Sequence, residues 1–121
     1  MSIRTERVSR LLQREIADLL NTEFSEQIHP LVTVTGTRVT KDLSIAYVDV
    51  SIMGDGIPQR QAAFGHLQEL TSKIRTALAH RIRHQVRKIP EIRFFLDETL
   101  EKAQKLDVLF ERLREEREHR Q

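Results

Sequence analysis

Residues 44–53 read SIAYVDVSIM, and this stretch decides the class of fold. The apolar members of its alternation are Ala46, Val48, Val50 and Ile52. Strict alternation of this kind predicts a strand with one buried face. A run rich in valine and threonine, residues 32–40, precedes it, and Lys41 and Asp42 lie between the two. The two runs therefore predict a β-hairpin, with Gly36 as a candidate bulge.

On the N-terminal side of the hairpin, the spacing of apolar residues predicts an amphipathic helix over residues 3–22. Its apolar face consists of Val8, Leu11, Leu12, Ile16, Leu19 and Leu20. On a helical wheel Arg7, Arg10 and Arg14 fall within about 60° of one another, opposite that face. Three arginines therefore point into solvent together, although a stripe of surface arginines often serves only solubility. His29 and Pro30 interrupt the helical pattern before the first strand.

On the C-terminal side, residues 54–58 contain two glycines and Pro58, which end the hairpin, and a second helical region begins near Gln59. Its apolar stripe consists of Ala63, Leu67, Leu70, Ile74, Ala77 and Leu78. Arg81 would fall on the apolar side of an unbroken helix. We therefore expect either a bend between Gly65 and Ala79 or the end of the helix near Arg81, although a single arginine can also snorkel.

Pro90 prevents a helix from continuing, and the alternation over residues 92–96 predicts a third strand, which we expect to be central in the sheet. Helical spacing returns over residues 98–113. Residues 114–121 contain no apolar side chain and are expected to form a charged, flexible tail. The predicted order αββααβ, followed by a C-terminal helix, indicates one α+β domain over residues 1–113, with a three-stranded sheet packed against helices.

The charge of the 121-residue chain is unevenly distributed, although its formal net value is only +2. Residues 1–14 hold four arginines and one glutamate, and residues 70–90 hold bases and no acid at all. The bases of the second segment are Lys73, Arg75, Arg81, Arg83, Arg87 and Lys88. A long acid-free basic segment suits phosphate neutralisation and favours a nucleic-acid partner over a merely solvated helix face.

Other classes of chemistry find little support in the sequence. Without cysteine there is no disulfide, thiolate metal site or cysteine nucleophile, so a reducing, cytoplasmic location is expected. We expect no signal peptide, no membrane span and no cofactor. His80 and His84 have the spacing of a zinc-binding pair, but no carboxylate accompanies them and a metal site is not favoured.

Catalytic and base-stacking sites are not favoured either. The acids Asp97, Glu98 and Glu101 lie where a helix is expected to begin, and Asp97 or Glu98 is better explained as a helix cap than as an acid–base catalyst. No nucleophile signature or glycine-rich phosphate loop is present. Aromatic residues are few, with Tyr47 and five phenylalanines mostly at core spacing, so a stacking platform for bases is not predicted.

The predicted order resembles the type II KH domain, whose usual RNA clamp is a G-x-x-G loop between two helices. The four glycines are Gly36, Gly54, Gly56 and Gly65, and none forms that pair. Over residues 4–113 the sequence resembles the ribosome-binding factor A family, which combines this topology with a missing G-x-x-G loop. The resemblance rests on Arg7, Val8, Ile16–Leu20, Val34–Gly36, Thr40–Leu43, Ala46–Val48, Ile74, Arg75, Leu78, Arg81–Arg83, Ile89–Ile92, Phe94, Asp97 and Leu100.

The resemblance implies a non-catalytic assembly factor that binds the immature small (30S) ribosomal subunit and its rRNA. It further implies that the protein supports late 16S rRNA maturation and 5′-end processing, and that it supports growth at low temperature. An assembly GTPase is then expected to displace the protein from the subunit. The family carries an Ala-x-Gly kink between two helices, and the matching positions here are Leu70, Thr71 and Ser72. The expected RNA-binding residues are Arg7, Arg10, Arg14, Lys73, Arg75, Arg81, Arg83, Arg87 and Lys88. We expect the protein to be a monomer.

Two alternatives remain open at this point. The first is a KH-like domain that binds another structured RNA through the same basic residues. The second is a protein-interaction module that uses the helix Leu100–Leu113 as its apolar contact. If that helix belongs to the core, its deletion will unfold the domain; if it is only a contact, the domain will remain folded.

Overall fold

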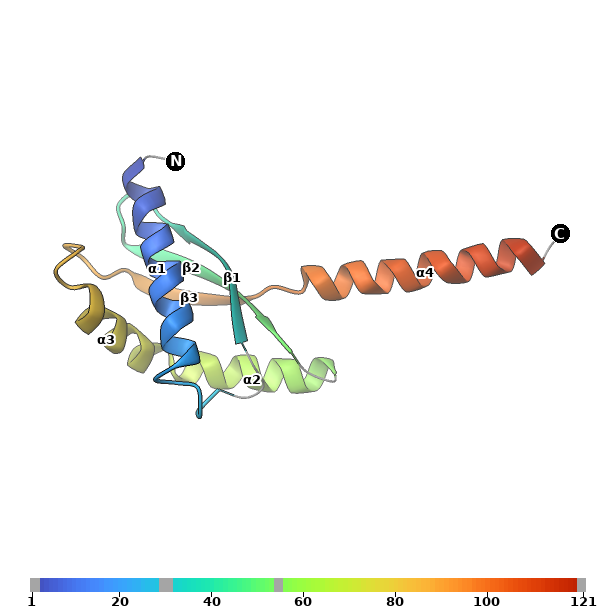
Figure 1. Cartoon of the computed structure of the whole chain (residues 1–121), viewed down its shortest axis with the longest axis horizontal. Coiled ribbons are helices and arrows are strands. Elements are labelled where there is room, and N and C mark those ends of the chain that lie inside the picture. The colour runs from blue at the N-terminus through green and yellow to red at the C-terminus, as the bar shows by residue number, and fades with distance from the viewer. Residues whose placement is uncertain (1–2, 29–31, 54–55, 120–121) are drawn as a thin grey trace.

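The computed structural model describes residues 3–28, 32–53 and 56–119, without the side chains of 99–107 and 119, and its elements follow the predicted order. The described residues form four helices and three strands (Figure 1): α1 Ile3–Asn21, β1 Val32–Val39, β2 Ile45–Ile52, α2 Ile57–Glu69, α3 Thr71–Ile82, β3 Glu91–Leu96 and α4 Thr99–His119. The order αββααβ with a C-terminal helix is confirmed. His29, Pro30, Gly54 and Asp55 lie outside the described residues.

The strand order in the sheet is β1-β2-β3, so β2 is central and β3 is an edge. The prediction that the third strand is central was wrong. β2 pairs antiparallel with β1 through the hairpin and parallel with β3, with Val48 opposite Phe94. The crossover through α2 and α3 returns the chain to the free side of β2, and alternation within β3 carries no information about its neighbours.

The predicted bulge lies in β1, where the register with β2 shifts between Val34 and Gly36. Thr35 is left out of the ladder, and its hydroxyl donates a hydrogen bond of 2.9 Å to the Asp97 carboxylate. Asp97, one of the acids expected at the start of the last helix, therefore also connects the end of β3 to the bulge. A bulge of this kind inserts one extra residue and bends the strand.

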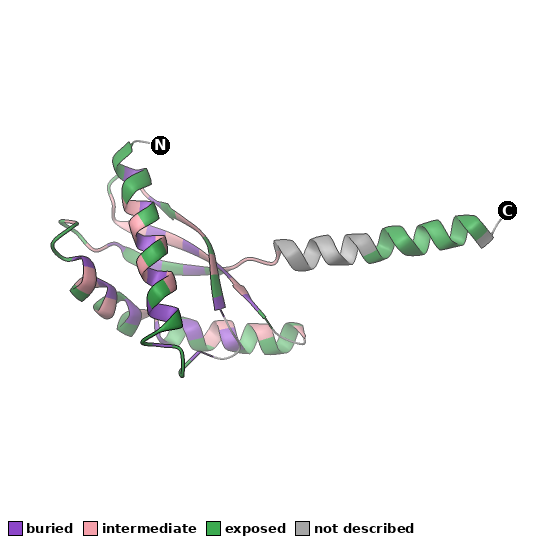
Figure 2. Cartoon of the chain, viewed as in Figure 1, coloured by how far each residue is buried: buried purple, intermediate pink, exposed green. Residues whose placement is uncertain are grey.

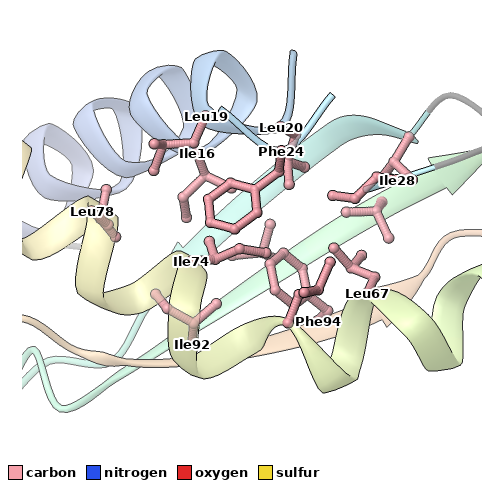
Figure 3. Packing of buried hydrophobic residues seen from close by; sticks show 14 of the residues in the cluster. Ile16, Leu19, Leu20, Phe24, Ile28, Leu67, Ile74, Leu78, Ile92 and Phe94 are labelled. Carbon is pink, nitrogen blue, oxygen red and sulfur yellow. The ribbon is translucent and has the colours of Figure 1, made fainter. Parts of the chain in front are cut away.

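The core lies between one face of the sheet and the first three helices. Ala46, Val48 and Val50 of β2 are fully buried, as the alternation predicted. Figure 3 shows α1 on one side of this core and the α2–α3 pair on the other, with Phe24 and Ile74 between them. Among the described residues, none of the helices α1, α2 and α3 packs against the opposite face of the sheet.

The long helical region is divided at Leu70, which separates α2 from α3. Leu70 has right-handed helical angles (φ −85°, ψ −4°), and its side chain is 7% exposed. Thr71 and Ser72 form the first two positions of α3. No described residue at this break has positive φ, so the change of direction occurs without the conformation that glycine favours. The bend expected between Gly65 and Ala79 is thus present, and α3 also ends at Ile82.

α4 continues past Leu113 through the charged residues to His119 and extends away from the sheet (Figure 1). Glutamate and arginine are good helix formers, which explains why the residues after Leu113 are helical although none of them is apolar. The described side chains Val108, Leu109, Phe110 and Leu113 are all exposed, as the uniform exposure of this half in Figure 2 shows. The division into a domain of residues 1–113 and a flexible tail of residues 114–121 stays a prediction.

The hairpin turn is held by Asp42, whose Oδ1 accepts hydrogen bonds from the hydroxyls of Thr40 (2.8 Å) and Ser44 (2.6 Å) and from the Ser44 backbone N–H (3.1 Å). These bonds, led by that of the Ser44 hydroxyl, lower the pKa of Asp42 from 3.8 to about 2. Leu43, the next residue, has a φ of 60°, a value that a branched residue adopts only at a cost. The Asp42 carboxylate therefore fixes a turn that is otherwise strained.

We expect Asp42→Asn to remove one component of the acid sensitivity of folding. A pKa lowered by folding means that the ionised carboxylate stabilises the native turn above the unfolded value near 4, and that this stability is lost as the pH falls through about 2. Urea unfolding between pH 5 and pH 2 should show a smaller fall for the variant than for the parent. Identical falls in the two proteins would show that the turn carboxylate has an ordinary pKa.

Candidate nucleic-acid interface

The first basic surface lies on α1, opposite the face that packs on the sheet. Leu12, Ile16 and Leu19 are fully buried, and Arg7, Arg10 and Arg14 are exposed on the other side. The helical period alone produces this separation, because residues three, four and seven apart lie on one face. The predicted arginine stripe therefore exists as a surface.

The second basic surface is the turn that follows α3, and it lies across a groove from the stripe. What we call the phosphate groove consists of two adjoining hollows that share Arg7, Val8, Gln85 and Val86. The first is also lined by Arg10, Leu11 and Arg14, and the second by Ile3, Arg4, Leu43 and Arg87. Its floor is apolar, since Val8, Leu11 and Val86 pack against the core. Two basic segments about 70 residues apart in the sequence thus meet at one groove.

The cations around the phosphate groove are available to a ligand. Arg7, Arg10 and Arg87 have no carboxylate within ion-pair distance among the described residues, and the same holds for Arg4, Arg83 and Lys88 nearby. Arg14 lies 3.5 Å from the Glu15 carboxylate, but its side chain is 73% exposed. Exposed and unpaired guanidinium groups beside one another repel in the free protein and gain most from a polyanion.

Arg75 is expected among the RNA-binding residues, but its guanidinium group is used within the protein. Its Nε donates to the carbonyl of Pro90 (3.1 Å), and its Nη2 donates to the carbonyl of Ile89 (2.8 Å). These bonds join α3 to the segment that leads into β3. Arg75 therefore positions the basic turn, and a contact of Arg75 with RNA stays a prediction.

Arg81 is also engaged, which explains how an arginine lies on the apolar side of α3. Its guanidinium group lies 2.5 Å from Asp18, 3.3 Å from Glu23 and 3.4 Å from Glu15, and its side chain is 26% exposed. The hydrogen bond to Asp18, followed by the bond to Glu23, raises the pKa of Arg81 above its usual value. The network ties α3 to α1, and whether Arg81 also contacts RNA stays a prediction.

Replacing Arg81 with methionine is expected to lower the free energy of unfolding by about 1–2 kcal/mol, since three carboxylates lose their shared partner and repel one another. Thermal unfolding at neutral pH measures the effect, and added salt should reduce it. Arg83→Met is the matched control, because Arg83 is exposed and has no ion pair among the described residues. Equal melting temperatures for the two variants would contradict a structural role for Arg81.

Lys73 and the two histidines do not join the phosphate groove. Lys73 lines a separate hollow on α3 with Thr76, His80 and Arg81. His84 follows the end of α3 at Ile82, so it does not share a helical face with His80 as the spacing suggested. No group of three potential metal ligands occurs within the described part of the chain. Nor does any described helix have the length and apolarity needed to cross a bilayer.

Three exposed or half-buried side chains at these surfaces were not among the residues predicted from the sequence. Arg4 lines the end of the phosphate groove, and its position three residues before Arg7 placed it on the same helical face. Tyr47 and Phe95 form an aromatic pair on the open face of the sheet. The alternation that buried Val48 and Phe94 also placed their neighbours on the opposite face, so the signal for this pair was present in the strand pattern.

The order αββααβ and the three-stranded sheet with helices on one face define a KH-like domain of type II, and this chain lacks the G-x-x-G loop of that class. Comparison with known proteins then identifies the particular family. The sequence profile of the family described as ribosome-binding factor A matches residues 4–110. The chain belongs to this family.

Named relatives agree over nearly the whole length. A ribosome-binding factor A of Chlorobium phaeobacteroides (strain BS1) is 46% identical over 109 residues, which cover 90% of this chain and 92% of the relative. The Chlorobaculum tepidum protein of the same name is 41% identical over 121 residues and covers 100% and 99% of the two chains.

Solved structures have the same fold. The crystal structure of ribosome-binding factor A from Thermus thermophilus superposes on this chain with a TM-score of 0.60. The match covers 76% of this chain and 94% of that protein, and at 24% sequence identity it establishes similarity of fold only. A homology model of the Thermus thermophilus protein, fitted into a cryo-EM map of a 30S–RbfA complex, superposes with a TM-score of 0.55 at 25% identity over 72% and 88%.

Proposed function

We propose that this protein binds the immature small ribosomal subunit, that it contacts rRNA phosphates through the phosphate groove, and that it catalyses no reaction. The observation that carries the proposal is the meeting of α1 and the turn after α3, which places Arg7, Arg10 and Arg87 around one groove. A Thermus thermophilus family member has been fitted into a map of a 30S complex, which supports the choice of subunit.

The apolar floor of the groove supports a docking role over general attraction to polyanions. Val8, Leu11 and Val86 leave room between the arginines for a sugar or the edge of a base, whereas the guanidinium groups contact phosphates and fix orientation. We propose that binding supports late 16S rRNA maturation and 5′-end processing by holding rRNA in place. We also propose that the protein acts as a monomer in the cytoplasm and that an assembly GTPase displaces it.

Co-sedimentation tests this function. The purified protein is centrifuged with isolated small subunits, large subunits and bulk structured RNA, each at two salt concentrations. We expect selective association with small subunits that weakens at the higher salt, because phosphate contacts release condensed cations. Equal binding to every RNA would support a KH-like binder of general structured RNA instead, and no binding at either salt would exclude both.

A protein contact through α4 is the second candidate, because Val108, Leu109, Phe110 and Leu113 are between 47% and 58% exposed. No described residue of α4 belongs to the core cluster. Truncation after Asp107 is therefore expected to change the free energy of unfolding by less than about 0.5 kcal/mol. Thermal unfolding of the truncated chain checks this, and a large loss of stability would place α4 in the core and remove the second candidate.

A further inference from the structure

The open face of the sheet, opposite the helices, carries an ordered row of side chains across all three strands. Arg38 of β1 pairs in register with Tyr47 of β2, and Tyr47 pairs with Arg93 of β3. The residues on either side of Tyr47, Ala46 and Val48, are fully buried on the helix side. The pleat therefore places the Tyr47 ring on the open face, between two arginines.

Phe95 completes this surface. Its ring centroid lies 5.7 Å from that of Tyr47, with the two planes inclined at 39°, and the guanidinium carbon of Arg38 lies 5.9 Å from the Tyr47 centroid. Phe95 is 47% exposed. Two adjacent rings on the open face, with a cation beside them, leave part of their π surface uncovered by the described residues, since Tyr47 is half-buried and Phe95 is exposed.

We propose that Tyr47 and Phe95 form a stacking platform for unpaired RNA nucleotides, with Arg38 and Arg93 beside the ring pair to receive the phosphates. The proposal rests on the proposed function, since it adds a second rRNA contact on the face opposite the helices. Bases stack on exposed aromatic rings without regard to their identity, and sheet faces suit this because neighbouring strands space the rings for successive bases.

The charges around the platform favour RNA over an apolar protein partner. Arg38 has no carboxylate partner among the described residues. Arg93 forms an ion pair with Glu91 (3.3 Å), but both side chains are exposed, so Arg93 can readily exchange this partner for a phosphate. Thr33 and Ser51 pair elsewhere on this face, and an apolar helix laid across it would remove their hydroxyls from water.

The acids on this face predict how the platform binds. Asp49 lies opposite Phe95 in the register, and Glu91 lies beside Arg93, so these acids offset much of the attraction that Arg38 and Arg93 exert on the phosphates. Most of the affinity must therefore come from stacking. Binding at the platform should depend weakly on salt, in contrast to binding at the phosphate groove.

The composition of the chain provides a direct test. Tyr47 is the only tyrosine, and the chain contains no tryptophan, so its intrinsic fluorescence reports on the platform alone. The full-length protein is titrated with single-stranded octauridylate and octaadenylate at two salt concentrations, with free tyrosine amide as the control for absorption by the RNA. We expect saturable quenching whose midpoint changes little with salt.

Phe95→Leu keeps apolar bulk and removes the ring, and we expect it to weaken oligonucleotide binding about tenfold without changing the salt dependence. Phe110→Leu is the matched control, because Phe110 is 58% exposed on α4 and should leave this binding unchanged. Circular dichroism confirms that both variants are folded. Intrinsic tyrosine fluorescence that does not respond to RNA, or equal affinity of both variants, would overturn the platform.

The two proposals fail separately. If the platform is wrong and the proposed function right, small subunits will still bind in a salt-sensitive way and Phe95→Leu will have no effect. If the phosphate groove is wrong and the platform right, the oligonucleotides will quench Tyr47, but charge reversal after α3 will leave small-subunit binding unchanged.

Discussion

Reversing Arg83, Arg87 and Lys88 to glutamate is expected to reduce binding to small subunits by at least about a hundredfold at about 0.1 M salt. Each phosphate contact contributes roughly 0.7 to the salt exponent of binding to single-stranded RNA, so three lost contacts remove about two units of slope. All three side chains are exposed, and none has an ion pair among the described residues. The fold should therefore persist. Co-sedimentation over a salt series measures the affinity and the slope.

The control for this triple variant must carry the same change of charge. Arg112, Arg114 and Arg117 are exposed on α4, away from the phosphate groove, and their reversal to glutamate alters the net charge by the same amount. We expect this control to bind nearly as well as the parent. Equal weakening of the two triple variants would mean that binding follows overall charge, and unchanged binding of the first would remove the turn after α3 from the mechanism.

Ile74→Ala is expected to lower the free energy of unfolding by about 2–5 kcal/mol, the largest stability effect that we predict from the core. Ile74 is fully buried in α3, it belongs to the same core cluster as Phe94 (Figure 3), and α3 packs against both α1 and β3. The truncation removes three carbon atoms from this packed core, and a cavity remains because the surrounding structure relaxes only partly.

Thermal unfolding provides the measurement, and a loss of this size should lower the melting temperature by at least about 8 °C. Ile74→Val should cost only about 0.5–1.5 kcal/mol, because one methyl group is removed. Val108→Ala, at a side chain that is 51% exposed on α4, should leave the melting temperature within about 2 °C of the parent. A similar small change for Ile74→Ala would show that α3 is not packed as described.

Much of the fold follows from local patterns in the sequence. The alternation of residues 44–53 and the spacing of apolar residues in α1 predicted elements that the structure places within a residue or two of the expected bounds. Pro90, whose missing N–H excludes it from a helix interior, directly precedes β3, although α3 already ends at Ile82. The arginine stripe on α1 followed from the helical period alone.

The candidate site was only partly predictable, because the sequence gives no basis for distinguishing the basic residues that face a ligand from those that bind within the protein. Arg7, Arg10 and Arg87 line the phosphate groove, whereas Arg75 donates to backbone carbonyls and Arg81 is paired with three carboxylates. All carry the same charge. Their roles differ because the acids and carbonyls that approach them come from distant parts of the chain.

The sequence by itself determined which segments are helices and strands, which of their faces are apolar, and that the family is ribosome-binding factor A. The tertiary structure alone decided that β2 is central, that the expected bend in the long helical region falls at Leu70, and that α1 and the turn after α3 share a groove. It also decided that Tyr47 and Phe95 lie together. Periodicity and backbone preference act over a few residues, whereas strand order, ion pairing and grooves depend on contacts between residues far apart in the sequence.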